Sequence, residues 1–237
     1  MAKQKTHTDK REMEGKETVE VFKDLDRGAL DTERFLEKHA KTLITVFVAF
    51  VVLVLGYFAY EQFYVGPRNE EATLSYLAAQ KNLSEGNVEL ALGGKNAANP
   101  GFLGTHKDFP GTKVGKLSAY NAGLLKFKEG KYQEAYDLLE KFSSNNKVLM
   151  ALKYGAMADC QINLNKNEDA LSLLDKASSA SDDPYTSYYF TRKAGLVSLA
   201  LKKNAEAKKY FSAIDEKYQD YDNGMSDSYI EMSKYLN

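Results

Sequence analysis

The residues of this sequence that could catalyse a reaction or bind a metal are few and far apart. Three histidines, His7, His39 and His106, fall in unrelated segments, and no two have the spacing of metal ligands. The one cysteine, Cys160, rules out a disulfide or a cysteine-based zinc site within one chain. No catalytic constellation is present, so the sequence predicts a protein without enzymatic activity, bound metal or cofactor.

Two short motifs resemble chemical sites but have simpler explanations. The stretch GGKNAANPG, which begins at Gly93, is too short for a phosphate-binding loop and lacks the Lys-Ser or Lys-Thr half of that motif. Asp182 and Asp183 stand before Pro184, an order typical of a helix start rather than of a metal site. We expect Cys160 to be a small core residue.

Composition restricts the class of protein further. The chain has 237 residues and a formal net charge of -1, with 43% hydrophobic and 27% charged residues. This length allows one or two domains. A near-neutral chain lacks the basic surface that general binding to nucleic acid requires, so we expect no nucleic-acid partner.

One segment differs sharply from the charged sequence around it. Residues 42–60 contain no charged residue and no proline, and as a helix they would extend about 28 Å, close to the thickness of the bilayer hydrocarbon. The segment is apolar all round, unlike a core helix with a polar stripe, and it starts too late and is too long for a signal peptide. It therefore predicts a single transmembrane helix in the lipid bilayer. The predicted anchor residues are Thr42, Leu43, Ile44, Val46, Phe47, Phe50, Val54, Leu55, Tyr57 and Tyr60.

The basic residues that flank this segment predict its orientation. Arg27, Arg34, Lys38 and Lys41 precede it, whereas Arg68 alone lies comparably close after it. Because basic flanks stay in the cytoplasm, the N-terminus is predicted to be cytoplasmic and the rest of the chain to be outside, in the periplasm of a bacterium. Three parts follow from this: a charged, disordered arm over 1–30, a juxtamembrane and transmembrane helix over 31–65, and an extracytoplasmic domain over 66–237.

The remainder of the chain is an internal repeat. A small residue is followed twelve positions later by an alanine at 123 and 135, again at 158 and 170, and again at 195 and 207, with a fainter copy at 79 and 91. The three stronger alanines are spaced by 35 and 37 residues, and apolar residues recur at helical spacing. These positions resemble the tetratricopeptide repeat, a pair of helices that meet at small residues.

The resemblance implies an all-α fold. We expect a TPR-like α-solenoid of three to four helix pairs, ending in a C-terminal capping helix that starts at Ser226. A glycine-rich stretch near 93–115 predicts an irregular insertion, for which a functional loop and a spacer are both open.

In this family the first helix of each pair lines a concave groove. The residues that match groove positions are mainly apolar, which favours a hydrophobic segment or a partner domain as ligand. Members that clamp acidic peptide tails use Lys and Asn where this chain has Tyr120 and Leu124, so a carboxylate clamp is not predicted. The candidate partner groove comprises Leu117, Tyr120, Leu124, Phe127, Asp159, Ile162, Tyr189, Arg192 and Leu196. Leu152 and Leu199 also match groove positions of the family.

A cytoplasmic arm, one span and an extracytoplasmic repeat domain together resemble the YfgM-like ancillary subunits of the bacterial Sec translocon, as does the sequence GTKVGKLSAYNAGLLKFKEGKYQEAYDLL from Gly111. The resemblance implies a non-catalytic inner-membrane subunit that associates with SecYEG and a PpiD-like membrane-anchored periplasmic chaperone, and that aids the hand-over of translocating polypeptides. Two alternatives are a scaffold of another cell-envelope complex and an enzyme regulator that acts through its cytoplasmic arm.

Overall fold

The computed structural model describes residues 36–235, in which every regular element is a helix apart from one isolated bridge between Asn96 and Asn99. The chain divides between Val65 and Gly66 into two compact units. The predicted arm over 1–30, and the basic residues Arg27 and Arg34, lie outside the described residues.

The first unit contains the apolar segment. Residues 36–60 are α-helical and lead into a short π-helix, η1 (Glu61–Val65). Among the described residues, one helix, Leu36–Ser84, is long and apolar enough to cross a membrane, and no part of its most apolar window is buried. The predicted anchor side chains are exposed, with the exception of Val54, which is half-buried. Two aromatic rings that follow the segment, Tyr60 and Tyr64, stack with centroids 5.2 Å apart.

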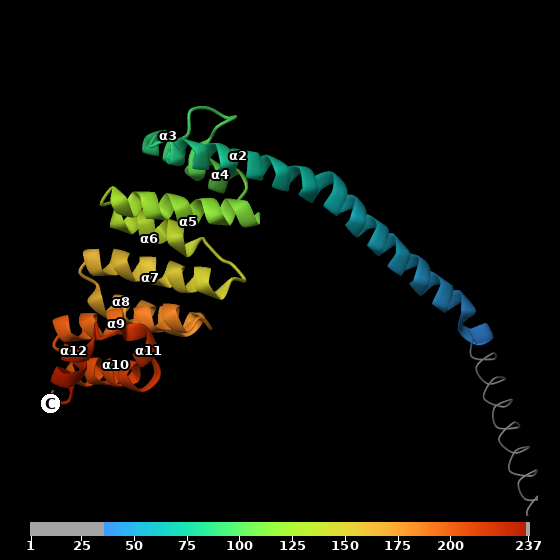
Figure 1. Cartoon of the computed structure of the whole chain (residues 1–237). Helices are drawn as coiled ribbons and strands as arrows, with labels where there is room; N and C mark the ends of the chain where they lie inside the picture. Colours follow the sequence, from blue (N-terminus) through green and yellow to red (C-terminus); the bar gives the residue numbers. More distant parts are fainter. Residues whose placement is uncertain (1–35, 236–237) are drawn as a thin grey trace, which may run out of the picture. The chain divides into compact units, whose positions relative to one another are not determined.

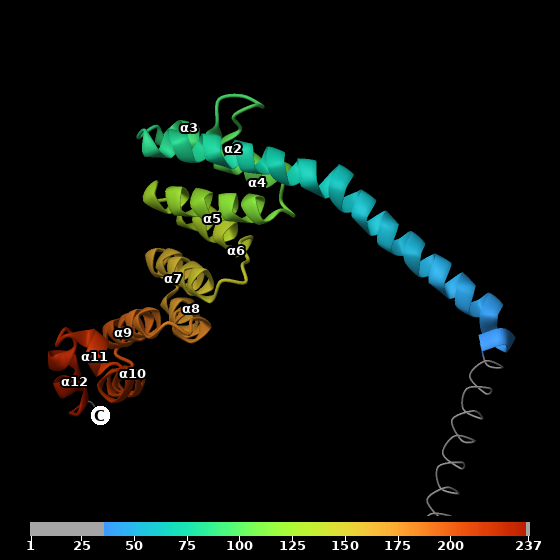
Figure 2. The ribbon, with the colours of Figure 1, turned by 45° about the vertical axis from the view of Figure 1, so that its right-hand side comes forward.

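The second unit is an α-solenoid, as the repeat pattern predicts. Four helix pairs follow one another in chain order and stack in layers (Figures 1 and 2). A short helix, α4, stands between the first and second pairs, and two more, α11 and α12, follow the last. The pairs are α2 (Gly66–Ser84) with α3 (Val88–Gly93), α5 (Lys113–Lys128) with α6 (Tyr132–Glu140), α7 (Lys147–Asn163) with α8 (Asn167–Ala180), and α9 (Pro184–Ala200) with α10 (Asn204–Lys217).

The turn inside each pair has the same backbone geometry. Gly86, Gly130, Asn165 and Lys202 each adopt a left-handed φ, between 59° and 81°. In every turn the next residue donates its N–H to a carbonyl five residues back, at 2.8 to 3.0 Å, which is the Schellman ending of a helix. The faint first repeat therefore shares its turn with the three clear ones.

Lys202 is the turn residue whose type fits this geometry least, because a side chain with a Cβ is strained at φ 59°. We expect Lys202→Gly to raise the free energy of unfolding by about 1 kcal/mol, measured by urea denaturation. The control is Lys208→Gly, in the exposed interior of α10, which should lower it by about the same amount. A loss of stability in both variants would contradict the prediction.

The small residues of the repeat lie where the paired helices touch. Ala135, Ala170 and Ala207 are fully buried. A Cβ added at Gly123 would stand 2.8 Å from Cγ of Leu139, which is closer than carbon atoms approach without displacement. The predicted function of these positions, close approach of two helices, is confirmed.

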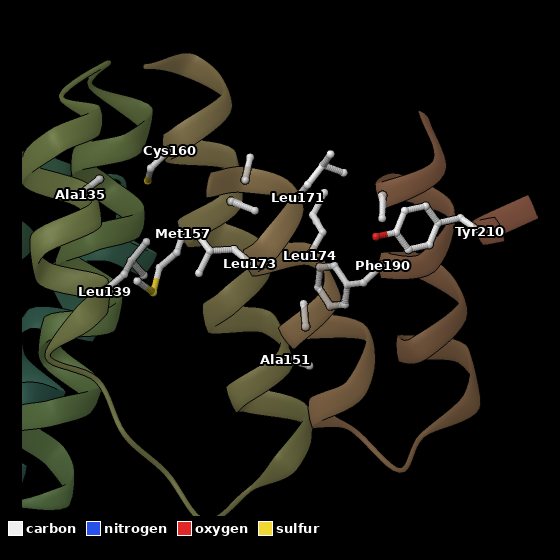
Figure 3. Packing of buried hydrophobic residues seen from close by; sticks show 14 residues of the cluster. Ala135, Leu139, Ala151, Met157, Cys160, Leu171, Leu173, Leu174, Phe190 and Tyr210 are labelled. Atoms are coloured by element: carbon white, nitrogen blue, oxygen red, sulfur yellow. The ribbon is translucent and has the colours of Figure 1, made fainter. Parts of the chain in front are cut away.

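The largest hydrophobic cluster joins the last three pairs. In this cluster Met157 of α7 lies beside Leu139 of α6, and Leu174 of α8 lies beside Phe190 of α9 (Figure 3). Phe190 also fills the space beside Gly155, where an added Cβ would come within 2.1 Å of the phenylalanine Cε1. Apolar contacts between consecutive helix pairs thus stabilise the solenoid, because each pair buries apolar surface against the next.

The glycine-rich stretch differs from the irregular loop that its composition predicts. It contains α4 (Gly101–Asp108), and Phe102 of this helix is fully buried, with its ring centroid 5.5 Å from that of Tyr76. Arg68 fixes the end of the helix by donating to the Asp108 carbonyl at 2.7 Å. The apolar residues within the stretch decide the outcome, because Phe102 and Phe109 can be buried only if the chain folds back onto α2 and α5.

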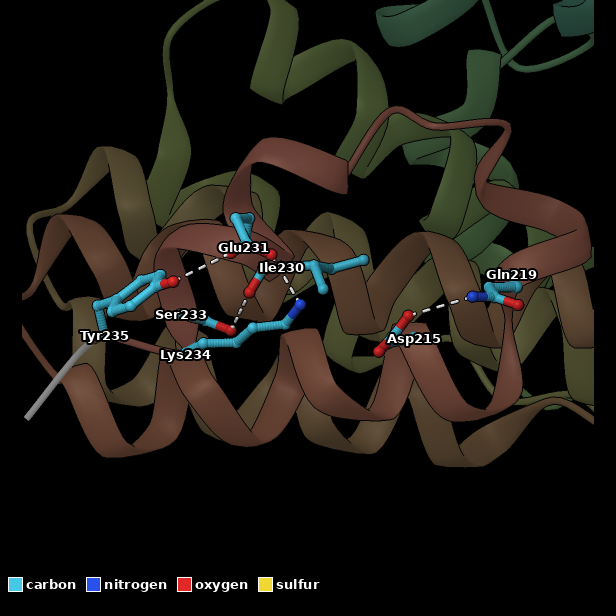
Figure 4. A network of polar contacts seen from close by, with 7 residues as sticks. All are labelled: Asp215, Gln219, Ile230, Glu231, Ser233, Lys234 and Tyr235. Atoms are coloured by element: carbon cyan, nitrogen blue, oxygen red, sulfur yellow. Dashed lines mark hydrogen bonds and ion pairs between the residues drawn. The ribbon is translucent and has the colours of Figure 1, made fainter.

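The C-terminal end is closed by α11 (Gln219–Asp222) and α12 (Asp227–Ser233). A helix that follows Ser226 is as predicted. At the end of α12, Lys234 donates from Nζ to Glu231 at 2.7 Å, and the Tyr235 hydroxyl donates to the same carboxylate (Figure 4). At the start of α11, Gln219 donates to Asp215 of α10 (Figure 4). On the inner side of α12, Tyr229 and Ile230 pack against buried residues of α10. The cap therefore covers apolar surface that would otherwise face water.

Candidate protein-interaction surface

The first helices α5, α7 and α9 carry the residues predicted to line the groove, and the structure buries most of them in part. Tyr120, Leu124, Phe127 and Ile162 pack against the largest core cluster, and Leu196 packs against the cluster under the cap. Burial raises the pKa of the Tyr120 hydroxyl. These five residues therefore contribute to packing along the first helices and present only part of their surface to a ligand.

Two of the predicted groove residues are polar, and both have partners within the chain. Asp159 forms an ion pair with Lys193 of α9, with an N–O distance of 2.5 Å. Arg192 donates from Nε to the Ser226 hydroxyl at 3.2 Å, so it contacts the segment that leads into the cap. Their role in partner binding stays a prediction.

Exposed apolar residues of α7 and α9 lie at groove positions and one turn before them. Val148 and Leu152 of α7 are 37% and 40% exposed, and Tyr185 and Tyr189 of α9 are 56% and 49% exposed. Val148 and Tyr185 are 37 residues apart, and so are Leu152 and Tyr189. Ala170 and Ala207 have the same separation, so the residues of α7 and α9 occupy equivalent positions of successive repeats. Exposed apolar side chains at equivalent positions of successive repeats are typical of protein-interaction surfaces. We call these four residues the apolar patch.

Sequence reasoning identified Leu152 and Tyr189 as groove residues but missed Val148 and Tyr185. The signal was present, since both residues lie four positions before a groove position on the same helical face. The family pattern does not point to the first turn, which is why these two were overlooked.

A cavity of about 410 Å³ opens at the start of α5. Leu117, a predicted groove residue, lines it together with Phe142 and Leu149. Lys113 and Lys116 also line it, and within residues 36–235 neither has an ion-pair partner. The remaining lining residues are Ser143, Ser144, Asn145 and Asn146. The lining of the cavity thus combines three apolar side chains and two cationic ones with four polar residues.

A buried lysine fixes the wall of this cavity. Lys153 of α7 is 8% exposed and donates from Nζ to the carbonyls of Glu140 and Phe142, at 3.1 and 2.7 Å. Burial lowers the pKa of its ammonium group, and the nearby Glu140 carboxylate opposes this effect. A cation at the C-terminal end of α6 is favourable because the last helical carbonyls lack partners. Lys153 therefore holds the α6–α7 connection that forms the wall.

The groups that could do chemistry occupy structural positions. Cys160 is buried on α7, and burial raises the pKa of its thiol to about 12, so the thiol stays protonated. Asp183 caps α9 by accepting from the Thr186 N–H at 2.8 Å, and Asp182 pairs with Lys147. His106 Nδ1 lies 3.1 Å from the Gly115 carbonyl. Within residues 36–235 no three His, Cys, Asp or Glu side chains form a group that could hold a metal ion.

Stacked helix pairs with an exposed apolar patch define a helical-repeat scaffold, a class of protein that binds other proteins and is typically non-catalytic. The family model described as "Tetratricopeptide repeat-like domain" matches residues 33–232, and the chain belongs to this family.

One solved structure agrees with this fold assignment. The chain is similar to a structure titled "Crystal structure of MamA protein", with a TM-score of 0.50, 15% identity, and coverage of 69% of this chain and 81% of that one. A second, titled "Crystal structure of MamA", has a TM-score of 0.49, 16% identity, and coverage of 65% and 81%. At this identity the likeness shows the fold alone. No curated protein sequence matches the chain.

Proposed function

We propose that this protein is a single-pass protein of the bacterial inner membrane and an ancillary, YfgM-like subunit of the Sec translocon. One observation carries the proposal: a long apolar helix, with no buried residue in its most apolar window, precedes the repeat scaffold in the chain. The match to the family model begins at residue 33 and so includes this helix. An exposed helix of this composition is stable only when lipid or another protein covers it.

The proposal assigns each of three successive segments of the chain to one side of the membrane or to the membrane itself. Residues 1–30 form a cytoplasmic arm, residues 31–65 cross the membrane, and residues 66–237 form a periplasmic domain. The excess of basic residues before the span, with Lys38 and Lys41 closest to it, supports this orientation. In this arrangement the span holds the repeat domain near the exit of SecYEG.

We propose the apolar patch and the adjoining cavity as the contact surface for partner proteins. Val148, Leu152, Tyr185 and Tyr189 would bind an apolar or aromatic segment, and Lys113 and Lys116 would pair with acidic residues beside it. The partners would be translocating polypeptides and a PpiD-like chaperone. Because the anchor confines the domain to the exit, weak contacts suffice through a high effective concentration.

One pull-down in mild detergent tests both parts of the proposal. The full chain should recover SecY and a PpiD-like chaperone, identified by mass spectrometry, and a chain lacking residues 1–65 should lose SecY. The variant Leu152→Ser with Tyr189→Ser should still recover SecY but about tenfold less chaperone, because it loses two apolar side chains that the bound partner would bury.

The matched control is Tyr221→Ser with Met232→Ser, two residues that are also exposed but belong to the C-terminal cap. It should behave as the unmodified chain. Recovery of cell-wall or division proteins without SecY would overturn the translocon proposal in favour of a scaffold of another envelope complex. Equal chaperone recovery by both double variants would overturn the proposed role of the patch.

A further inference from the structure

The outer face of α2, in the first layer of the solenoid, carries two exposed leucines. Leu74 is 63% exposed and Leu77 is 51% exposed, whereas Ala72, Ser75 and Ala79 on the opposite face are buried. With 100° between successive residues, positions 70, 74, 77 and 81 lie within about 60° of one another and form a single stripe. We call Glu70, Leu74, Leu77 and Lys81 the α2 stripe.

The same face is covered in the other pairs. Gly123 and Ala135 lie 44 residues after Ala79 and Ala91, and that offset places Ser118 and Leu125 of α5 at the positions of Leu74 and Lys81. Both α5 residues are buried. The corresponding residues of α7, Lys153 and Cys160, are buried as well. The α2 stripe therefore has the position of an inter-repeat contact, without a preceding helix pair to cover it.

The opposite end of the solenoid is already closed. Helices α11 and α12 cover Phe211 and Ile214, which are fully buried. Head-to-tail stacking of one copy on the next is thus blocked at the capped end. A symmetric contact between two uncapped ends remains available, since a two-fold interface uses the same surface on both copies.

The charges on the stripe match such a contact. In an antiparallel pair centred between Leu74 and Leu77, each Leu74 faces the Leu77 of the other copy. The same alignment places each Glu70 opposite the Lys81 of the other copy, because Glu70 and Lys81 are equally far from the centre. Lys81 lies 3.9 Å from Glu85, which directly follows α2, and both side chains are exposed, so the ammonium group can also contact a second carboxylate. In a parallel pair Glu70 would face Glu70 and Lys81 would face Lys81, which is repulsive.

We propose that the α2 stripe is a homodimer interface in which two copies pair α2 in antiparallel orientation. The leucines form the centre and two Glu70–Lys81 ion pairs close the ends. Two chains anchored in one bilayer can form this antiparallel pair only if the helix Leu36–Ser84 bends between its apolar part and α2. The π-helical segment Glu61–Val65 and Pro67 are features at which helices commonly bend.

The full chain in mild detergent should change from dimer to monomer on dilution, as measured by light scattering or sedimentation. Leu74→Asp with Leu77→Asp should abolish the dimer. Glu70→Lys or Lys81→Glu alone should weaken it about tenfold, because two attractive contacts become repulsive. The double variant Glu70→Lys with Lys81→Glu exchanges the charges and should restore the dimer to within about twofold of the unmodified chain.

Lys217→Glu, an exposed change of the same charge on α10, should leave the dimer intact. In native membranes the double variant Leu74→Cys with Leu77→Cys, which places a cysteine opposite a cysteine of the other copy, should form an oxidised dimer. Tyr185→Cys should not; all three positions are exposed, and the natural Cys160 is buried. A monomer at every concentration, or a double charge exchange as weak as either single one, would overturn the proposal. Neither readout involves SecY, so this inference and the proposed function can fail separately.

Discussion

Replacing Phe211 with alanine is expected to lower the free energy of unfolding by about 3–5 kcal/mol, as removal of a fully buried ring usually does. Phe211 of α10 is 0% exposed, and its ring stacks on that of Tyr229 in α12 with centroids 5.4 Å apart. On its other side it lies against α9, where a Cβ added at Gly195 would be 2.9 Å from its Cζ. One side chain thus joins the last pair to the cap, and alanine would leave a cavity among all three helices.

The measurement is urea denaturation of the full chain in mild detergent, followed by far-ultraviolet circular dichroism. Tyr221→Ala removes a ring that is 36% exposed and should change the unfolding free energy by no more than about 0.5 kcal/mol. Phe211→Leu keeps most of the apolar volume and should lie between the two. If Phe211→Ala were as mild as the Tyr221 control, the cap would not depend on this ring.

Much of the repeat could be predicted because its signals are local. Gly123, Ala158 and Gly195 mark close contacts by type, and a small residue at a fixed interval needs no knowledge of distant partners. The turn at Lys202 shows the limit of such signals, since lysine gives no indication of a left-handed conformation. The register of the neighbouring repeats does indicate it, through Gly130 and Asn165 at the same place.

The interaction surface was less predictable because exposure depends on what the next helix covers. Leu124 and Leu152 look alike in sequence, yet Leu124 packs against the core and Leu152 is 40% exposed. Likewise, Phe102 in a glycine-rich stretch becomes a core residue only because α2 lies beside it. These outcomes depend on packing between helices, which helical periodicity alone does not specify.

Contacts across long sequence intervals were not predictable at all. Asp222 accepts from the Tyr188 hydroxyl at 2.7 Å, across 34 residues, and from the Ser226 N–H and hydroxyl at 2.8 and 2.6 Å. The Arg192 guanidinium reaches the same serine. Asp222 is only 3% exposed, so this network ties the cap to α9 inside the protein. Nothing in the sequence around Asp222 distinguishes it from the exposed Asp220.

Asp222→Ala is therefore the second change with a large expected effect, a loss of about 3 kcal/mol in the free energy of unfolding. Alanine removes the acceptor of three hydrogen bonds and leaves the buried Tyr188 hydroxyl without a partner. Burial, followed by the bond to Asp222, raises the pKa of Tyr188 to about 12, so the hydroxyl remains a proton donor at ordinary pH. Asp220→Ala, at an exposed neighbour, is the control in the same urea experiment and should change stability by no more than about 0.5 kcal/mol.

The pH dependence of stability gives this prediction a second, independent readout. Burial tends to raise the pKa of Asp222, but the hydrogen bonds from Ser226 and Tyr188 outweigh it, and the pKa lies below its ordinary value. An acid with a lowered folded-state pKa stabilises the protein above its unfolded pKa of about 3.9, and this stabilisation is lost as the pH falls through the folded-state pKa. The difference in unfolding free energy between the unmodified chain and Asp222→Asn should accordingly be largest near neutral pH and shrink in acid. A difference that stayed constant with pH would show that the carboxylate charge does not hold the cap, and that Asp222 acts by shape alone.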